Sequence, residues 1–394
     1  MRLRGFIGMV ALYALLVIPA GAVAPSVPLP AIQPGYKPTP QGKDEQGLWL
    51  EMQEYEQQLM RSPLLVRDPG LNTYVKDITC RVAGPYCADI RVYIVRNPAF
   101  NASMAPNGTM IIWTGLLTRV SSGDELATVL GHETAHFVRT HSITQWRSIR
   151  KGMAAGQILS LGLGVATGVL LPVGESFAAL SALSFSRQQE AEADLLGAQM
   201  MAGAGFDPHA SYRVWDMLIA EDKRAVDKGE EGSTLLRTHP ESDDRSEVLR
   251  EWTTATYGPP PAPRQDPAFR DAMAANYRLF MDDQIDTSRY SRTEFLLERH
   301  AAIGVDPALI EFYRGEMFRQ RAGDGDAIRA RDAYAASVAM GHPVPDAYRN
   351  LGYFYTKAGD RQAARENFKR YLEVVPDADD RAMIEFYLQD EDVP

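Results

Sequence analysis

The spacing of apolar residues changes several times along the chain, and each change marks an expected element. The first is residues 45–61, whose apolar positions include Leu48, Leu50, Met52, Tyr55 and Leu59. This pattern is typical of an amphipathic helix that packs against a core. Asp68-Pro69 supplies a capping residue followed by a proline, so a second helix is expected from there to Val82.

Farther along, the apolar spacing changes to two. Ile90, Val92 and Ile94 alternate with more polar residues, as in a half-buried strand. Residues 106–108 (Pro-Asn-Gly) form a turn sequence, and residues 109–113 are β-branched and aromatic enough for a second strand. The pattern predicts either a purely structural hairpin or an exposed sheet edge that holds an extended peptide substrate by main-chain hydrogen bonds.

A third helix is expected around the apolar run from Leu126 to His132, and residues 122–125 (Ser-Gly-Asp-Glu) give it a capping-box start. After it, residues 153–183 are apolar, rich in glycine and close in length to a membrane span. One span would put the residues before and after it on opposite sides of a membrane. We therefore expect a buried or lid-like element, with a membrane-touching loop as the alternative.

The C-terminal part of the sequence is helical and shows a repeat. Helices are expected at 186–202 and 241–255, and the proline-rich residues 258–263 are the clearest domain boundary. Beyond it, one set of positions falls on the tetratricopeptide pattern of about 34 residues, and a weaker set lies one repeat earlier. The stronger set is Tyr348, Leu351, Gly352, Tyr355, Ala364, Phe368 and Pro376. Stacked helix pairs of this kind make a concave surface for protein partners.

Composition is that of an ordinary globular protein, with 45% apolar and 23% charged residues among 394. The net charge of −10 argues against nucleic acid as a partner. Residues 1–22 have the layout of a secretory signal peptide, with an uncleaved membrane anchor as the alternative. Cys80 and Cys87 are the two cysteines, and their spacing allows one structural disulfide in an oxidising compartment.

The candidate chemistry is concentrated in residues 131–136 (Gly-His-Glu-Thr-Ala-His), which contain the pattern H-E-x-x-H. His132 and His136 lie on one face of a helix, about one turn apart, and can bind the same Zn²⁺ ion. Glu133 is rotated by about 100° from His132, so it misses the metal but can act on a water at the metal. We interpret this stretch as part of a zinc peptidase site.

A catalytic zinc site needs a third protein ligand. His141 follows His136 by five residues, about 140° round a continued helix, so we expect it to point elsewhere as a surface or outer residue. Glu190 is the better candidate. The alternative is that Glu190 belongs to an acidic surface helix without a metal role.

Three features of residues 186–197 favour the metal role. Glu190 and Asp194 share one helical face, and Ala193 and Gly197 are small enough to let this helix approach the H-E-x-x-H helix closely. Asp194 can then accept a hydrogen bond from a ligand imidazole, as metal-bound histidines usually require. Glu192 is expected on the far side as a solvated charge.

H-E-x-x-H followed by S-R-x-x-E-x-E-A-D-x-x-G resembles the zinc peptidases related to the CAAX prenyl protease and HtpX. The N-terminal signal and C-terminal repeats make it similar to the BepA-type periplasmic members, over roughly residues 45–250. The resemblance implies one Zn²⁺ per subunit and a set of site residues: His132, His136 and Glu190 as ligands, Glu133 as general base, and Asp194 as a supporting or proton-donating carboxylate. It also implies that His239 lies near the metal, where it would occupy the fourth position in a resting state or steady the oxyanion as a catalytic residue. Spacing alone makes it a His-Pro at a helix start.

These inferences predict an α+β, predominantly helical fold with five parts. They are a signal peptide (1–22), a proline-rich linker (23–43), a zincin-like metallopeptidase domain with a small β-hairpin or sheet (44–258), a second linker (259–265) and an all-α tetratricopeptide-like domain (266–394).

The expected function is that of a periplasmic zinc endopeptidase acting on misfolded or stalled envelope or outer-membrane proteins. Expected partners are protein or peptide substrates, envelope-assembly machinery bound through the repeats, and a peripheral membrane contact. The alternative is a chaperone or scaffold whose main output is binding, with proteolysis held latent by residues 153–183 or His239.

Overall fold

The computed structural model describes residues 26–39, 41–154, 185–230, 242–262, 265–340 and 344–389. The expected signal peptide, His239 and nearly all of the apolar segment 153–183 lie outside the described residues. Within the described ranges, no helix combines the length and apolar character needed to cross a membrane.

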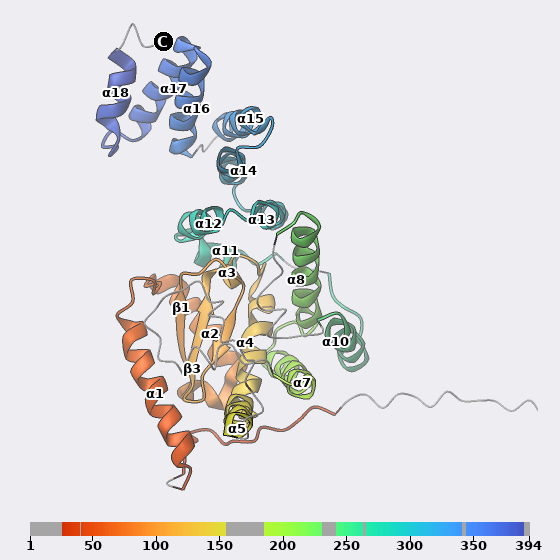
Figure 1. The fold of residues 1–394 in the computed structure, drawn as a ribbon. Helices are drawn as coiled ribbons and strands as arrows, with labels where there is room; N and C mark the ends of the chain where they lie inside the picture. Colours follow the sequence, from red (N-terminus) through yellow and green to blue (C-terminus); the bar gives the residue numbers. More distant parts are fainter. Residues whose placement is uncertain are drawn as a thin grey trace, which may run out of the picture.

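The first part of the chain folds as an α+β unit with a small sheet, and the remainder is helical, so the predicted fold class is confirmed (Figure 1). The elements of the first part are α1 (Lys43–Met60), α2 (Pro69–Ala83), the 3₁₀ helix η1 (Gly84–Asp89), β1 (Arg91–Val95), β2 (Ala102–Met104), β3 (Thr109–Trp113), α3 (Thr114–Leu117), α4 (Gly123–Val138), α5 (His141–Ala154), α7 (Arg187–Gly203), α8 (Ala210–Asp227) and α10 (Ser242–Tyr257).

The sheet has the strand order β1-β3-β2. The predicted hairpin is present, but β2 and β3 form it, pairing antiparallel through the turn at 106–108. The first expected strand, β1, instead pairs parallel with β3, with Arg91 opposite Thr109. The sequence did not predict β2 because a three-residue strand is too short to show an alternating pattern.

Helices cover both faces of the sheet. Leu48, Met52 and other apolar side chains of α1 pack against Tyr93, Val95 and Ile111 on one face. On the other face, side chains of β1 and β3 join the main core with α2 and α4 (Ile94, Met110, Ile112, Leu71, Val75, Leu126 and Leu130). Because successive side chains of a strand point to opposite faces, β1 and β3 contact α1 on one face and the first turns of α4 on the other.

The proline-rich residues before α1 do not form a free linker. The backbone amides of Ala31 and Ile32 donate to the carbonyl of Val138 at 2.7 and 3.2 Å, and Tyr86 donates to the carbonyl of Ile32 at 2.8 Å. Ile32 is buried in the main core. We call residues 29–36 the N-terminal strap. The strap lies within the predicted proline-rich linker (23–43), and its apolar side chain and amides find partners on the domain.

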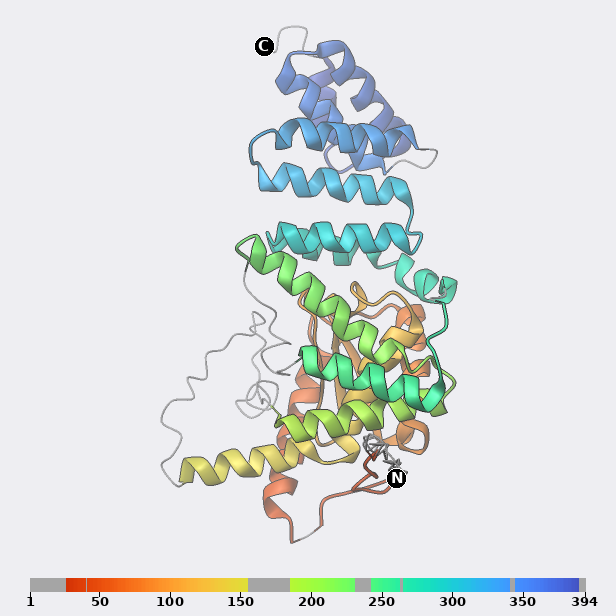
Figure 2. The same ribbon diagram turned by 90° about the vertical axis from the view of Figure 1, so that its right-hand side faces the viewer.

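The C-terminal helices form a column that rises from one end of the α+β unit (Figures 1 and 2). They are α11 (Pro267–Ala274), α12 (Tyr277–Asp286), α13 (Tyr290–Ala302), α14 (Pro307–Arg321), α15 (Asp326–Ala339), α16 (Pro345–Ala358), α17 (Arg361–Val374) and α18 (Arg381–Gln389). We call residues 267–389 the helical arm. Helices α14 and α15 pack as one pair, and α16 and α17 as the next.

Each pair is closed by a glycine lying against an aromatic ring. A Cβ on Gly315 would lie 2.5 Å from Tyr334, and one on Gly352 would lie 2.4 Å from Phe368. Tyr334 and Phe368 are one predicted repeat apart, but the two glycines are not, because the connection after α14 is longer than the one after α16. This difference explains the weaker match of the first repeat to the sequence pattern.

Candidate metal centre

The two histidines of the H-E-x-x-H motif point to one place. Both come from α4, whose first turn is capped by the Ser122 side chain as the capping-box sequence predicts. His132 Nε2 and His136 Nε2 lie 3.0 Å apart, and both rings are buried. Two buried nitrogens at this distance can act as donors to the same ion.

Glu190 reaches the same place from α7, whose N-terminus has a capping box formed by Ser186 and Gln189. Its Oε2 lies 3.5 Å from His132 Nε2, and its Oε1 lies 3.6 Å from His136 Nε2. All three residues are buried, and their donor atoms lie within 4.8 Å of one another. Donors about 2.0–2.1 Å from a tetrahedral Zn²⁺ are separated by about 3.4 Å. The structure thus brings together the three predicted ligands at spacings that fit Zn²⁺.

The crossing of α4 and α7 depends on two glycines. A Cβ added to Gly197 would lie 2.7 Å from the amide nitrogen of His132, and one added to Gly131 would lie 2.8 Å from the carbonyl oxygen of Gly197. The predicted close approach of the two helices is confirmed, and Gly197 is central to it. Without this contact Glu190 would be held farther from the two histidines.

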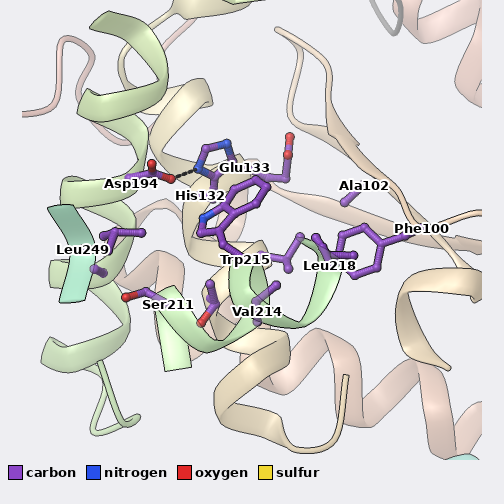
Figure 3. Close-up of a pocket in the computed structure, with 13 residues that line it drawn as sticks. Phe100, Ala102, His132, Glu133, Asp194, Ser211, Val214, Trp215, Leu218 and Leu249 are labelled. Atoms are coloured by element: carbon purple, nitrogen blue, oxygen red, sulfur yellow. Dashed lines mark ion pairs between the residues drawn. The ribbon is translucent and has the colours of Figure 1, made fainter. Parts of the chain in front are cut away.

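Asp194 and Arg245 support the site from behind His132. Asp194 Oδ1 lies 3.0 Å from His132 Nδ1, the ring nitrogen that faces away from the other donors (Figure 3). Arg245, from α10, donates to both oxygens of Asp194 at 2.7 Å and also contacts Glu190 Oε2 at 2.7 Å. One guanidinium therefore fixes the orientation of two carboxylates, which is the bidentate geometry that arginine favours.

The same contacts determine the charge on Asp194. Burial by itself would raise the pKa of this carboxyl, but Arg245 and His132 outweigh burial and hold the pKa well below its usual range. An ionised carboxylate accepts hydrogen bonds and cannot donate a proton. Of the two roles that the resemblance implies for Asp194, the geometry favours support of His132 over proton donation.

Glu133 lies beside the three donors without joining them. Its carboxyl is buried, and burial, assisted by Glu190 and opposed by His132, raises its pKa to about 7. Figure 3 shows it at the edge of a cavity that Phe100, Ala102 and Trp215 also line. The cavity measures about 30 Å³, enough to admit a water molecule. Such a carboxyl is suited to exchange a proton near neutral pH.

The surroundings of His136 differ in part from the expectation. His141 does not point away, because its Nδ1 lies 3.0 Å from His136 Nδ1 and its ring is buried; of the two expected places, it takes the one behind a ligand and not the one at the surface. Glu192 is not a solvated charge, because its Oε2 accepts from Arg139 at 2.7 Å and lies 3.3 Å from His141 Nε2. The prediction for His141 assumed a continuous helix, but α4 ends at Val138. Thr140, with φ 57°, then turns the chain before α5 begins.

Sequence reasoning missed three residues that complete the site. Arg245 was placed only in an expected helix at 241–255, and nothing in that stretch distinguishes it from Arg250 of the same helix. Trp215 lies under the Arg245 guanidinium, 4.1 Å from it, and edge-on to His132 (Figure 3). Phe185 stacks on His136 with ring centroids 4.1 Å apart. His239 lies outside the described residues, so its expected place near the metal stays a prediction.

Comparison with known proteins agrees with this geometry. Residues 67–253 match the model of peptidase family M48. The matched range includes all three candidate ligands, Glu133, Asp194 and Arg245, and it ends before the helical arm. The resemblance inferred from the two-part motif is thereby confirmed for this part of the chain.

Relatives with curated names are peptidases of two groups. Mitochondrial metalloendopeptidase OMA1 of Schizosaccharomyces pombe is 33% identical over 163 residues, covering 41% of this chain and 46% of that protein. The beta-barrel assembly-enhancing protease of Yersinia pestis is 28% identical over 232 residues, covering 55% of this chain and 46% of that protein. A putative protein of that name from Vibrio cholerae is 26% identical over 274 residues, covering 66% of this chain and 51% of that protein. The chain spans about half the length of these relatives.

Proposed function

We propose that this chain, whose residues 67–253 match the model of peptidase family M48, is a zinc-dependent endopeptidase. The observation that carries the proposal is the convergence of His132, His136 and Glu190, with the buried Glu133 carboxyl beside them. His132 Nε2, His136 Nε2 and a Glu190 oxygen would hold the ion. Zn²⁺ bound there would polarise a peptide carbonyl and lower the pKa of a coordinated water towards about 7.

The chain's own residues then have distinct tasks. Glu133 accepts a proton from the attacking water and passes it to the leaving amine, which its pKa of about 7 suits. Asp194 keeps the His132 ring oriented so that Nε2 faces the ion, and Arg245 holds Asp194 and Glu190 in place. Trp215 and Phe100 make the neighbouring cavity largely apolar, which limits access of bulk water.

Strand β2 is the proposed place for the substrate backbone. It lies at one edge of the sheet, next to α4, and Ala102 lines the cavity beside His132 and Glu133. At the other edge, β1 is already paired with Leu65. An extended peptide added alongside β2 would make main-chain hydrogen bonds and pass the metal site. We therefore favour the substrate-holding interpretation of the predicted edge over a purely structural hairpin.

The direct test is Glu133→Gln, which keeps the shape of the side chain and removes its ability to take a proton. We expect the variant to retain zinc and to lose at least about 10²-fold in cleavage rate on an unfolded protein substrate. Glu125→Gln, the same change in the first turn of α4, serves as the control and should cleave at nearly the wild-type rate. Wild-type cleavage by Glu133→Gln would remove Glu133 from the mechanism.

For location and substrates we propose the periplasm and misfolded or stalled envelope proteins. Three observations support this: the signal-like residues 1–22, the disulfide between Cys80 and Cys87, and the name of the Yersinia relative. The mitochondrial relatives make another compartment the competing possibility. Fractionation of cells that express the full chain tests it, because recovery of the protein in the cytoplasm with reduced cysteines would contradict a periplasmic role.

The helical arm is proposed to bind protein partners such as the envelope-assembly machinery. Its last two helices expose three large apolar side chains, Val374, Met383 and Phe386. Exposed apolar side chains that lie close together can mark a surface that binds a protein partner, so this exposure also favours the alternative of a scaffold that acts by binding. Retention of biological function by Glu133→Gln, together with its loss on Phe386→Ser, would favour the scaffold over the peptidase.

A further inference from the structure

The far side of His136 carries a chain of contacts that the proposed mechanism does not use. His136 Nδ1 faces His141 Nδ1 at 3.0 Å, and His141 Nε2 faces Glu192 Oε2 at 3.3 Å. The same carboxylate oxygen accepts from Arg139 Nε at 3.0 Å and from Arg139 Nη2 at 2.7 Å. These contacts run outward from a candidate ligand to an ion pair near the surface, whose side chains are about a quarter exposed.

Metal binding by His136 would determine which atom donates and which accepts in each of these contacts. When His136 uses Nε2 to bind a metal, its remaining ring proton must be on Nδ1. His141 Nδ1 must therefore accept that proton's hydrogen bond, and the proton of the neutral His141 ring must be on Nε2. That Nε2–H then donates to Glu192, which is an acceptor. Each donor in the series thus meets an acceptor, and only one tautomer of each ring satisfies the series.

The backbone is shaped to bring His141 into this position. Thr140 has φ 57°, a left-handed conformation that is costly for a β-branched residue. It separates α4 from α5 and turns His141 back toward His136, although the residues are only five apart. Strain of this kind is retained where surrounding contacts require it.

Arg139 is itself held by a second part of the chain. Its Nη1 donates to the carbonyl of Leu29 at 2.7 Å, and the adjacent Val138 carbonyl accepts from Ala31 and Ile32. The N-terminal strap therefore fixes the outer end of the series, while Phe185 stacks on the His136 ring at its inner end. Both ends are anchored to elements outside α4.

We propose that His141, Glu192 and Arg139 are positioning residues that orient His136 for metal binding, with the N-terminal strap holding Arg139. The inference rests on the proposed zinc site and deepens it: His136 receives its carboxylate support through a second imidazole, whereas His132 receives it directly from Asp194. Outer partners of metal-bound histidines commonly change metal affinity by about 10–100-fold.

The test measures how fast zinc leaves the full-length protein when a chelator is in excess, together with the melting temperature of the metal-free protein. His141→Phe keeps a ring and removes the acceptor. His141→Asn restores an acceptor close to the position of Nδ1. His209→Phe is the matched control, since His209 is also buried but contacts Asp207 and the Gly258 carbonyl instead.

We expect zinc to leave His141→Phe about 10–100-fold faster than the wild type, while His141→Asn recovers most of the retention and His209→Phe is unchanged. Equal zinc release from His141→Phe and the wild type would overturn the proposal. If His141→Phe does not fold, Glu192→Gln decides, because this partly exposed carboxylate should leave folding intact and still speed zinc release. A wild type that retains zinc but cleaves no substrate would overturn the proposed peptidase function and leave this comparison readable.

Discussion

The two histidines of one motif are supported in different ways. Behind His132, the buried Asp194 and Arg245 come from α7 and α10, so the support is made of segments far apart in sequence. Behind His136, Arg139 and His141 lie within five residues of the ligand and only Glu192 comes from another helix, α7. The Arg139–Glu192 ion pair is partly exposed. The first arrangement requires the domain to be folded around it, whereas the second can be disturbed without exposing the core.

This difference predicts which substitutions should destabilise the fold and which should only weaken metal binding. A buried charge that loses its partner is strongly destabilising. A partly exposed pair contributes little to folding but can still fix the direction of a ring. The four predictions below separate these two effects.

Asp194→Asn should have the largest effect. It leaves the Arg245 guanidinium buried against an uncharged amide, so we expect a loss of about 3–5 kcal/mol in the unfolding free energy of the metal-free protein. Urea denaturation after removal of metal measures this loss. A change below about 1 kcal/mol would show that the pair behind His132 is no more important for folding than the pair behind His136.

His300 extends the comparison to a third buried imidazole, whose two hydrogen-bond partners are a hydroxyl and a carbonyl group and not a carboxylate. It contacts Tyr277 Oη and the Thr118 carbonyl where the helical arm meets the α+β unit. Burial, opposed by the hydrogen bond to the Thr118 carbonyl and assisted by Arg299 and Arg119, lowers its pKa from 6.5 to about 4. The unfolded chain therefore binds the proton more readily, and stability present above pH 6.5 falls as the pH drops towards 4.

The expected loss from His300 reaches about 3 kcal/mol at pH 4. Urea unfolding of the wild type and His300→Gln at pH 7 and pH 4 isolates this contribution as the difference between the two proteins. An identical pH dependence in both would mean that His300 titrates normally in the folded state.

Gly197→Ala tests whether the crossing of α4 and α7 sets the ligand spacing. The added methyl would lie 2.7 Å from the His132 amide nitrogen, and backbone cannot yield as a flexible side chain can. We expect a loss of about 2 kcal/mol in stability and weaker zinc retention. Gly203→Ala on the same helix meets nothing within 4 Å and is the control. If both variants kept zinc equally well, the glycine contact would have no part in forming the site.

Glu192→Gln should have the smallest effect on folding. Its partner Arg139 is partly exposed, so removing the charge should cost less than about 1 kcal/mol in the metal-free protein. Zinc release from the same variant should still be faster than from the wild type. Thermal melting with and without bound zinc distinguishes the two effects, since only the zinc-bound protein should melt clearly earlier than its wild-type counterpart.

Much of the first arrangement could be predicted from the sequence because helical periodicity determines which residues share a face. That rule placed His132 with His136 and Glu190 with Asp194, and the small Gly197 indicated a close helix crossing. Arg245 could not be placed in the same way, since only the packing of α10 against α7 brings it to Asp194.

The second arrangement could not be predicted because it depends on where a helix stops. Periodicity assumes that the helix continues past His136, but Thr140 adopts a left-handed conformation that a β-branched residue does not suggest. The parallel pairing of β1 with β3 and the docking of the strap were missed for a similar reason. In each case, partners distant in the chain decide the local structure.

The central claim is that His132, His136 and Glu190 together hold one zinc ion. The most direct measurement is the zinc content of the purified protein after dialysis, for the wild type and for Glu190→Ala side by side. We predict one tightly held zinc per wild-type chain and a clear loss in Glu190→Ala, with His209→Phe retaining the wild-type content. Equal zinc content in the wild type and Glu190→Ala would contradict the three-ligand site.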